Sequence, residues 1–205
     1  MAATTESTEF TTESTELTAA AAAECATECA KLAAAFPGRV QFPGTPGYSA
    51  NKVSYFTQFE SEVSPACFIQ PQSAQEVSAI IKHVRSSSSN LAIRSGGHTT
   101  WAGSANIQAG ITIDLSKLKA NAAIVDPETK LATIGAGARW GDVYKTLAAK
   151  GLTVVGGRVT SVGVGGLSLG GTLIFSFHKL GMMAVVLDLL FLKLGVVVVM
   201  VYSLS

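Results

Sequence analysis

The sequence predicts an α+β fold, because short apolar strands alternate with helices that each carry one apolar stripe. A β-α-β unit runs from the strand 66–70 (ACFIQ), through a helix that begins at Ser73, to the strand 91–94 (LAIR). A second helix, over 139–150, lies between two stretches rich in glycine. Hydrophobic residues make up 48% of the 205 residues and charged residues 14%, which provides enough apolar material for one sizeable core.

The helix of this β-α-β unit has the clearest start. Ser73 occupies the N-cap position and Glu76 follows three residues later, which is the pattern of a capping box. The serine run 86–89 ends the helix. Its apolar residues recur at the spacing i, i+3, i+4, i+7 and predict one buried stripe: Val77, Ile80, Ile81 and Val84.

The remaining elements are shorter. We expect a strand over 111–115 (ITIDL), two strands within 123–136 that meet at a turn over 126–129, and a short strand over 153–155. The helix over 139–150 buries three apolar side chains, which share one face: Trp140, Val143 and Leu147.

The N-terminal region differs in composition from the rest. The first 30 residues hold six Glu and no Lys or Arg, and residues 1–18 repeat a polar, acidic pattern that predicts a disordered tail. An Ala-rich helix is expected over 19–35, ended by a Pro-Gly pair. We therefore divide the chain into a disordered acidic tail (1–18), an N-terminal helix with an irregular lead-in (19–60) and one domain (61–205).

Several functional classes lack their sequence signals. The formal net charge is +1 and Lys and Arg form no stripe, so we expect no nucleic-acid partner. The first residues show neither the basic nor the apolar segment of a secretory signal. Cys25, Cys29 and Cys67 have no further ligands at zinc spacing, so no metal is expected. One disulfide with a free thiol and three free thiols both remain open.

The first segment that could form a functional site is RSGGH, from Arg94 to His98. Two adjacent glycines directly after a strand allow the backbone to turn and to expose successive N–H groups, which favours phosphate oxygens. Arg94 could hold either the end of the sheet or a diphosphate, and His98 stands at the rim. The alternative interpretation is a tight turn at a strand end with a polar tip.

The second segment is the glycine-rich run 156–171 (GGRVTSVGVGGLSLGG). So many glycines among apolar neighbours indicate that the backbone packs directly against something flat, such as a bound ring system, or against another chain segment. Gly135-Ala136-Gly137 also follows a strand, but Trp140 takes the third glycine position of the dinucleotide fingerprint and the acidic residue expected downstream is missing. We therefore reject an NAD site.

Together, the two glycine segments resemble a known family. From about residue 32 to 171 the chain is similar to the berberine-bridge-enzyme-like, FAD-linked oxidases of the vanillyl-alcohol-oxidase superfamily, particularly fungal members with an FAD-binding PCMH-type domain. Five blocks carry the resemblance in the family's order and spacing: AAAFPGRV, PACFIQPQSAQEVSAIIK, LAIRSGGHTTWAGSANIQAGITIDLS, TIGAGARWGDVYKTLAAKGLTVVGGR and SVGVGGLSLGG.

The resemblance implies an FAD site. The segment RSGGHT would wrap the diphosphate, and His98 would bond covalently to a methyl carbon of the isoalloxazine, for which a neutral imidazole nitrogen is a suitable nucleophile. The run 163–171 would lie along the flavin and the ADP. Val159 stands where some relatives carry a second covalent link, through Cys. The implied cofactor-binding residues are Arg94, Ser95, Gly96, Gly97, His98, Thr99, Val159, Gly163, Val164, Gly165, Gly166 and Gly170.

The resemblance also concerns the cysteines. Family members often carry a Cys just before the strand that leads into RSGGH, and Ser89 stands at that position here. The resemblance therefore implies that Cys25 or Cys29 lacks its usual disulfide partner.

The region 172–205 departs from the family's pattern, because the Asp-Asn pair and the final turn of that pattern are missing. Three interpretations compete. A frame change or unspliced sequence in the gene is one, and a divergent pair of apolar strands that pack on the core is the second. The third is a membrane helix over 182–202, which Asp188 and Lys193 near its middle disfavour.

The expected function is that of an FAD-dependent oxidase fragment. FAD would accept a hydride from a small organic substrate and pass electrons to dioxygen. The family's general base comes from the substrate domain, which is absent here, so we name no catalytic residue. The alternatives are a catalytically inactive remnant that binds flavin weakly or not at all, and a membrane-tethered interaction protein. Family members are often secreted, yet no secretory signal is visible, so the location stays open between cytoplasmic and secreted.

Overall fold

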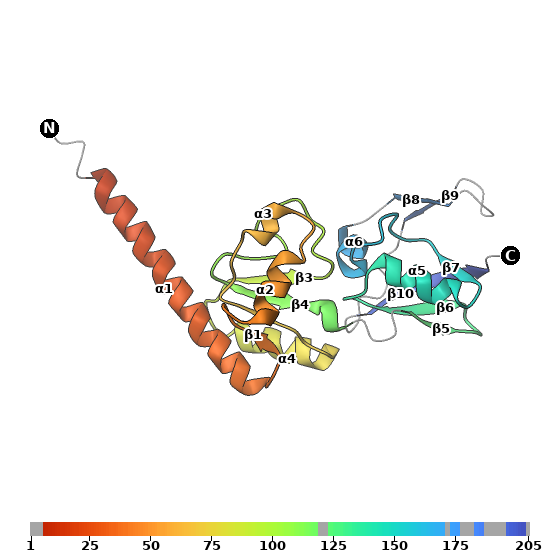
Figure 1. Ribbon diagram of the computed structural model, residues 1–205, viewed down its shortest axis with the longest axis horizontal. Helices are drawn as coiled ribbons and strands as arrows, with labels where there is room; N and C mark the ends of the chain where they lie inside the picture. Colours follow the sequence, from red (N-terminus) through yellow and green to blue (C-terminus); the bar gives the residue numbers. More distant parts are fainter. Residues whose placement is uncertain (1–5, 119–122, 171–172, 177–182, 187–195, 204–205) are drawn as a thin grey trace.

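The computed structural model describes residues 6–118, 123–170, 173–176, 183–186 and 196–203. The elements form two lobes side by side, and a long helix, α1, extends from the first lobe (Figure 1). The first lobe contains α1 (Glu6–Ala35), β1 (Val40–Gln41), α2 (Pro46–Val53), α3 (Gln58–Ser61), β2 (Cys67–Ile69), α4 (Ala74–Val84), β3 (Leu91–Arg94) and β4 (Ile111–Asp114), followed by the 3₁₀ turn η1 (Leu115–Lys117).

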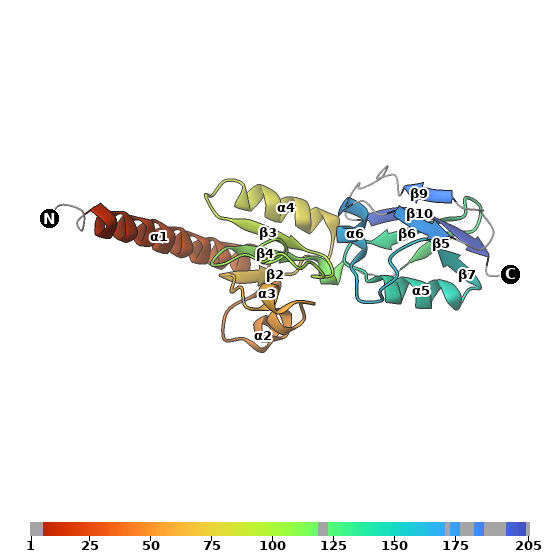
Figure 2. The same ribbon diagram turned by 90° about the horizontal axis from the view of Figure 1, so that it is seen from above.

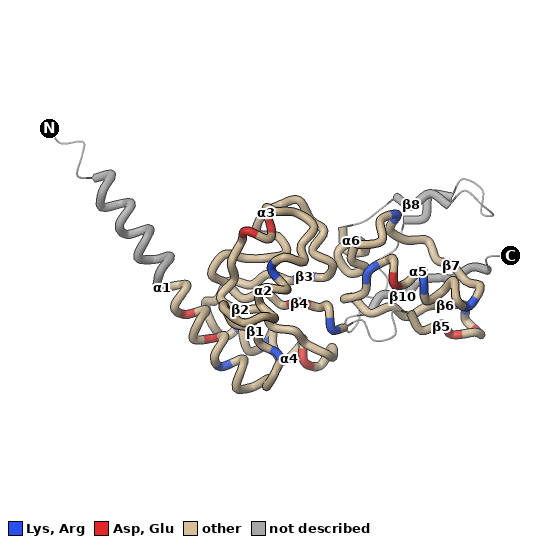
Figure 3. Tube along the Cα trace, viewed as in Figure 1, with Lys and Arg blue, Asp and Glu red and all other residues tan. Residues whose placement is uncertain are grey.

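The second lobe contains a mixed set of strands and two helices. Its elements are β5 (Ile124–Asp126), β6 (Leu131–Gly135), α5 (Trp140–Ala148), β7 (Leu152–Val154), α6 (Val164–Gly170), β8 (Leu173–Ser176), β9 (Met183–Val186) and β10 (Val196–Ser203). In both views, α6 lies at the junction with the first lobe (Figures 1 and 2). Lys and Arg are distributed over both lobes, with acidic residues between them (Figure 3).

The sheet of the first lobe has the strand order β1-β2-β4-β3. Strands β2 and β3 both run parallel to β4, so the predicted β-α-β unit is confirmed, with β4 inserted between its two strands. Helix α4 covers one face of the sheet, and α2 and α3 lie on the other (Figure 2). Because both faces are covered, β2 and β4 are buried along their whole length.

The predicted N-cap of α4 is present in the structure, whereas the return bond of the capping box is shifted by one residue. The Glu76 N–H donates to Ser73 Oγ at 3.1 Å, while the Glu76 carboxylate accepts from the N–H of Gln72, one residue before the N-cap. Ile80 and Val84 are buried, as predicted, but Ile81 is exposed on the edge of the stripe.

The N-terminal helix differs from its prediction. Helix α1 begins at Glu6, so the backbone of residues 6–18 is helical rather than a disordered tail, and residues 1–5 lie outside the described part. Towards its C-terminal end α1 packs against α4 and β1. Glu28 of α1 contacts His83 of α4 at 3.5 Å, so this histidine takes part in the contact between the two helices.

The cysteines form one disulfide. Cys29 of α1 is bonded to Cys67 of β2, and Cys25 is a buried free thiol on the same face of α1. Of the two arrangements that the sequence left open, the disulfide with one free thiol is therefore correct. Cys25 is the cysteine without a disulfide partner. The disulfide ties the long helix to the sheet that ends at the site described below.

Reduction of this disulfide should destabilise the first lobe. A cross-link that closes a loop of 38 residues limits the freedom of the unfolded chain and contributes about 3–4 kcal/mol in the chain-entropy model. We expect the free energy of unfolding in urea to fall by about that amount when reductant is added. Cys25→Ala is the control and should keep this sensitivity to reductant, whereas Cys67→Ala should lose it. A wild type with the same unfolding free energy with and without reductant would contradict the assignment of the disulfide.

The sheet of the second lobe has the order β5-β6-β10-β7 and is antiparallel at each pairing. Strands β5 and β6 meet at the turn predicted over 126–129, where Asp126 Oδ1 accepts from the N–H of Glu128 at 2.9 Å. Helix α5 packs on this sheet through the predicted stripe, because three side chains are fully buried in the lobe's core: Trp140, Val143 and Leu147.

Strand β10 lies between β6 and β7, so part of the divergent region 172–205 completes a sheet of the domain. Strands β8 and β9 pair with each other, from Leu173↔Val186 to Ser176↔Met183. The described parts of this region are therefore strands, in agreement with the interpretation as apolar strands. Among the described residues, no helix has the length and apolar character needed to span a membrane. Asp188 and Lys193 lie outside the described residues.

Candidate functional site

The two glycine segments meet at the junction of the lobes. The turn after β3 and the residue just before α6 contact each other through bare backbone at Gly96 and Gly163. A Cβ atom added to Gly163 would lie 2.7 Å from Gly96 Cα and 2.6 Å from Ser95 Oγ, so a side chain has no room at this position. Gly97 has φ +63°, a conformation that favours glycine, and it turns the chain towards His98.

A cavity of about 440 Å³ opens beside this contact. Three segments form its walls: the end of β3 with the following turn, the loop up to residue 105, and the start of α6. Its lining holds no Asp, Glu, Lys or Arg and consists of Ile93, Ser95, Gly96, Gly97, His98, Thr99, Ser104, Ala105, Val162, Gly163, Gly166 and Leu167. The structure thus gathers residues from both predicted glycine segments around one space.

Seven of the twelve residues implied by the resemblance line the cavity, and five do not. Val164 is buried in the core of the second lobe, and Gly165 packs against the carbonyl oxygen of Ala136. Val159 is 50% exposed, and both it and Gly170 lie away from the lining. The seven lining residues are Ser95, Gly96, Gly97, His98, Thr99, Gly163 and Gly166.

Arg94, the fifth residue outside the lining, points to the opposite side of β3. Its Nη1 donates to the carbonyl of Asn51 at 3.0 Å and its Nη2 donates to Ser54 Oγ at 2.6 Å, and the guanidinium lies 4.0 Å from the centre of the Tyr55 ring. The side chain is only 3% exposed. These contacts tie the end of β3 to α2 and to Ser54, and a role of Arg94 in holding a diphosphate stays a prediction.

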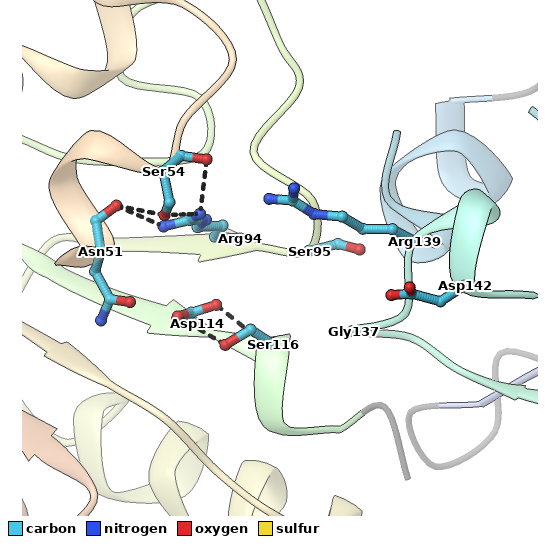
Figure 4. A pocket seen from close by; sticks show the side chains of 9 residues that line it. All are labelled: Asn51, Ser54, Arg94, Ser95, Asp114, Ser116, Gly137, Arg139 and Asp142. Atoms are coloured by element: carbon cyan, nitrogen blue, oxygen red, sulfur yellow. Dashed lines mark hydrogen bonds between the residues drawn. The ribbon is translucent and has the colours of Figure 1, made fainter. Parts of the chain in front are cut away.

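Arg94 faces a second cavity, of about 350 Å³, at the carboxyl ends of β3 and β4 (Figure 4). This cavity carries charges of both signs, and Ser95 is the residue that it shares with the first one. Figure 4 shows Arg139 and Asp142 on one side and Arg94 on the other. Its lining is Asn51, Ser54, Arg94, Ser95, Asp114, Ser116, Gly137, Arg139 and Asp142.

His98 is held on two sides at the rim of the first cavity. Its Nε2 lies 3.0 Å from Ser161 Oγ. The ring of Phe56 stacks on the imidazole with 3.8 Å between the centroids and 11° between the planes. The N–H of Phe56 in turn donates to the carbonyl of Gly97 at 3.0 Å, so the aromatic ring is fixed next to the turn that presents the histidine.

Sequence reasoning missed the residues that hold the outer loop of the cavity. Oε1 of the fully buried Glu60 accepts from the N–H and hydroxyl of Ser104 and from the N–H of Ala105, at 2.9–3.1 Å. Tyr55 donates to the carbonyl of Ala105 at 2.9 Å, and burial raises the pKa of this tyrosine well above its usual range, so the phenol stays protonated. Glu60 and Tyr55 contact residues that are 44 to 50 positions away in the sequence, so no local motif indicates their roles.

The apolar wall of the first cavity could have been predicted in part from the alternation of side chains along β3. Ile93 and Arg94 are neighbours on β3, and successive side chains of a strand point to opposite faces. Once Arg94 is placed on one side, Ile93 must face the other, and it lines the cavity there with an exposed fraction of 48%.

The flat partner of the glycine-rich run is in part a protein side chain. Gly156 and Gly157 pack against the indole of Trp140, and a Cβ on Gly157 would lie 2.6 Å from Trp140 Cδ1. These two glycines therefore do not need a bound ring system to explain them. Gly166, by contrast, has no atom within 4 Å of an added Cβ, and it faces the cavity.

The contact between the lobes should be sensitive to a single methyl group. Gly163→Ala would push a Cβ into the backbone of Gly96, and overpacking of this kind costs about 1–3 kcal/mol. Gly170→Ala is the matched control, because its Cβ would meet no atom within 4 Å. We expect urea denaturation to show a loss of unfolding free energy for the first variant only; equal midpoints would contradict the close contact.

Comparison with known proteins agrees with this geometry. The family model described as an FAD binding domain matches residues 65–191, and so extends beyond Gly171, where the departure from the pattern was expected. The FAD-dependent monooxygenase sdcF of Emericella nidulans is 42% identical over 156 residues, which cover 75% of this chain and 32% of that protein.

Two solved structures share the fold. The BBE-like 1 protein of Physcomitrella patens has a TM-score of 0.60 at 26% identity, over 70% of this chain and 30% of that one. The 6-hydroxy-D-nicotine oxidase of Arthrobacter nicotinovorans has a TM-score of 0.58 at 30% identity, over 66% and 29%. The chain spans about a third of the length of these relatives, and it belongs to the family of FAD-binding flavoprotein oxidoreductases.

Proposed function

We propose that the chain is the flavin-holding part of an FAD-dependent oxidase, with FAD in the cavity beside the Gly96–Gly163 contact and His98 as its covalent attachment point. The observation that carries this proposal is the convergence of two bare-backbone segments on one cavity with an imidazole at its rim. Bound FAD would supply the hydride-accepting chemistry, and the chain's own residues would bind and orient it.

The residues present fit such a group. The turn 95–99 offers a backbone without Cβ atoms at two positions, which suits the close approach of diphosphate oxygens. Ile93, Val162 and Leu167 add an apolar wall for a flat ring system. The cavity lining holds no carboxylate, so the negative charge of a diphosphate would meet no like charge there.

The whole protein would oxidise a small organic substrate, with dioxygen as the electron acceptor. The relatives include an oxidase among the solved structures and FAD-dependent monooxygenases among the curated proteins, and they support this class of reaction. Since this chain matches about a third of those proteins, the groups that select the substrate and remove its proton are assigned to the remainder of such proteins.

The proposal predicts an acid-stable yellow protein. The purified chain should absorb near the flavin bands, and the colour should stay with the precipitate in acid, because a C–N bond to His98 survives unfolding. His98→Ala should release all flavin into the supernatant. His83→Ala is the matched control, because His83 lies on α4 against Glu28, away from the cavity, and it should remain yellow.

Two other outcomes of this experiment are decisive. A folded but colourless wild type would overturn flavin binding by this chain and favour the inactive remnant. Flavin that acid releases from the wild type would overturn the covalent attachment and leave non-covalent binding in place.

Filling the cavity should block FAD without harm to the fold. Gly166→Leu would place a side chain in the open space that Gly166 faces, and replacing a helical glycine favours the helix by up to about 1 kcal/mol. We expect an FAD affinity at least about tenfold lower, from flavin fluorescence quenching, since displacing the ligand loses its contacts. Gly170→Leu, outside the lining, should bind as the wild type does; equal loss in both variants would place FAD elsewhere.

A further inference from the structure

The hydrogen bond between His98 and Ser161 joins the two glycine segments through their side chains. Ser161 stands 63 residues after His98 and contributes the hydroxyl that lies 3.0 Å from Nε2. The stacked ring of Phe56 fixes the plane of the imidazole, and the hydrogen bond fixes its rotation within that plane. Within the part of the chain that the structure describes, Nδ1 has no hydrogen-bond partner.

Ser161 is itself held firmly by α5. The N–H of Trp140 donates to the carbonyl of Val162 at 3.0 Å, and the N–H of Gly141 donates to the carbonyl of Thr160 at 3.0 Å. These two bonds flank Ser161 on both sides and anchor its turn on the first residues of the helix. The hydroxyl therefore has a fixed position relative to the core of the second lobe, to which Trp140 belongs.

We propose that Ser161 is the positioning residue for the attachment of flavin to His98, an inference that rests on the covalent link of the proposed function. A serine hydroxyl can accept as well as donate a hydrogen bond. When Ser161 Oγ accepts from Nε2–H, the neutral imidazole carries its proton on Nε2 and its free electron pair on Nδ1. Ser161 thus selects the nitrogen that attacks and keeps that nitrogen free.

Attachment forms one bond to the flavin and breaks one. A bond forms between Nδ1 and the flavin methyl carbon, and one C–H bond of that methyl group breaks. The hydrogen leaves as a proton, while its two electrons remain on the flavin ring, which is thereby reduced. Dioxygen reoxidises the ring and leaves as hydrogen peroxide. The imidazole becomes positively charged when Nδ1 is alkylated, and it returns to neutral when Nε2 loses its proton.

Ser161 acts most strongly at the stage where the ring is positively charged. A hydrogen bond from a charged donor is shorter and stronger than one between neutral groups. Ser161 Oγ therefore stabilises the charged imidazole more than the neutral one, which lowers the barrier to bond formation. Non-covalent binding of FAD does not use this difference, so the two steps can be separated experimentally.

The test compares the rate of attachment with the affinity of binding. Flavin-free protein is mixed with FAD in air, and acid-stable flavin is followed over time by in-gel fluorescence, while fluorescence quenching gives the initial affinity. Ser161→Ala should slow attachment by about 10–100-fold, the effect of removing one hydrogen bond to a charged group, with the affinity within about threefold of wild type. Ser161→Thr, which keeps the hydroxyl, should restore most of the rate.

A neighbouring hydroxyl provides the matched control. Thr160→Ala removes the hydroxyl from the adjacent residue, whose backbone carbonyl still bonds to Gly141, and it should attach FAD at the wild-type rate. Equal attachment rates in Ser161→Ala and the wild type would overturn the role of Ser161 and leave the covalent link intact. A failure of Ser161→Thr to recover would also overturn it, because a hydroxyl would then not be what matters. Acid-labile flavin in the wild type would overturn the link itself, and with it this role.

Discussion

The site depends on the direct contact between the backbones of Gly96 and Gly163. These residues belong to different lobes, and no side chain separates them. Further bonds surround the contact: Ser95 Oγ donates to the carbonyl of Ala136 at 2.6 Å, and Arg139 Nη2 donates to the carbonyl of Gly96 at 3.3 Å. Because each of these bonds links the turn after β3 to the second lobe, the walls of the cavity keep a fixed separation.

The end of β3 serves both sides of the sheet. Ile93 faces the cavity, whereas Arg94 faces the end of α2 and holds it through Asn51 and the following Ser54. The chain continues from there into Phe56, whose ring stacks on His98. Arg94 therefore supports the histidine from behind without lining its cavity.

The sequence predicted what local patterns determine. The N-cap at Ser73, the β-α-β order around α4 and the buried stripe of α5 follow from spacing alone, because each depends on residues a few positions apart. The end of β3 and the glycine-rich run 156–171 were predicted as one site because together they resemble the FAD-linked oxidases, whereas composition alone marked them as two separate segments. The side of β3 on which Arg94 lies was left open, since strand alternation needs one residue to be placed first.

What the sequence could not show depends on contacts between distant residues. Glu60 has no neighbouring motif, and its role follows only from the loop that folds back over it. From the sequence, the packing of Gly156 on Trp140 could not be distinguished from the packing of backbone on a bound ring, because both require bare backbone beside a flat surface. The start of α1 at Glu6 contradicts a composition that otherwise indicates disorder.

The place of β10 has a consequence for how the protein assembles. Strand β10 lies between β6 and β7, and each of these pairs with β10 rather than with the other. During synthesis the first lobe can close its sheet as soon as β4 has emerged, but the second must wait for residues 196–203. Pairings between segments far apart in the chain form slowly. Until β10 has been synthesised, the edges of β6 and β7 that will pair with it stay open. Strands of other chains would add at these edges.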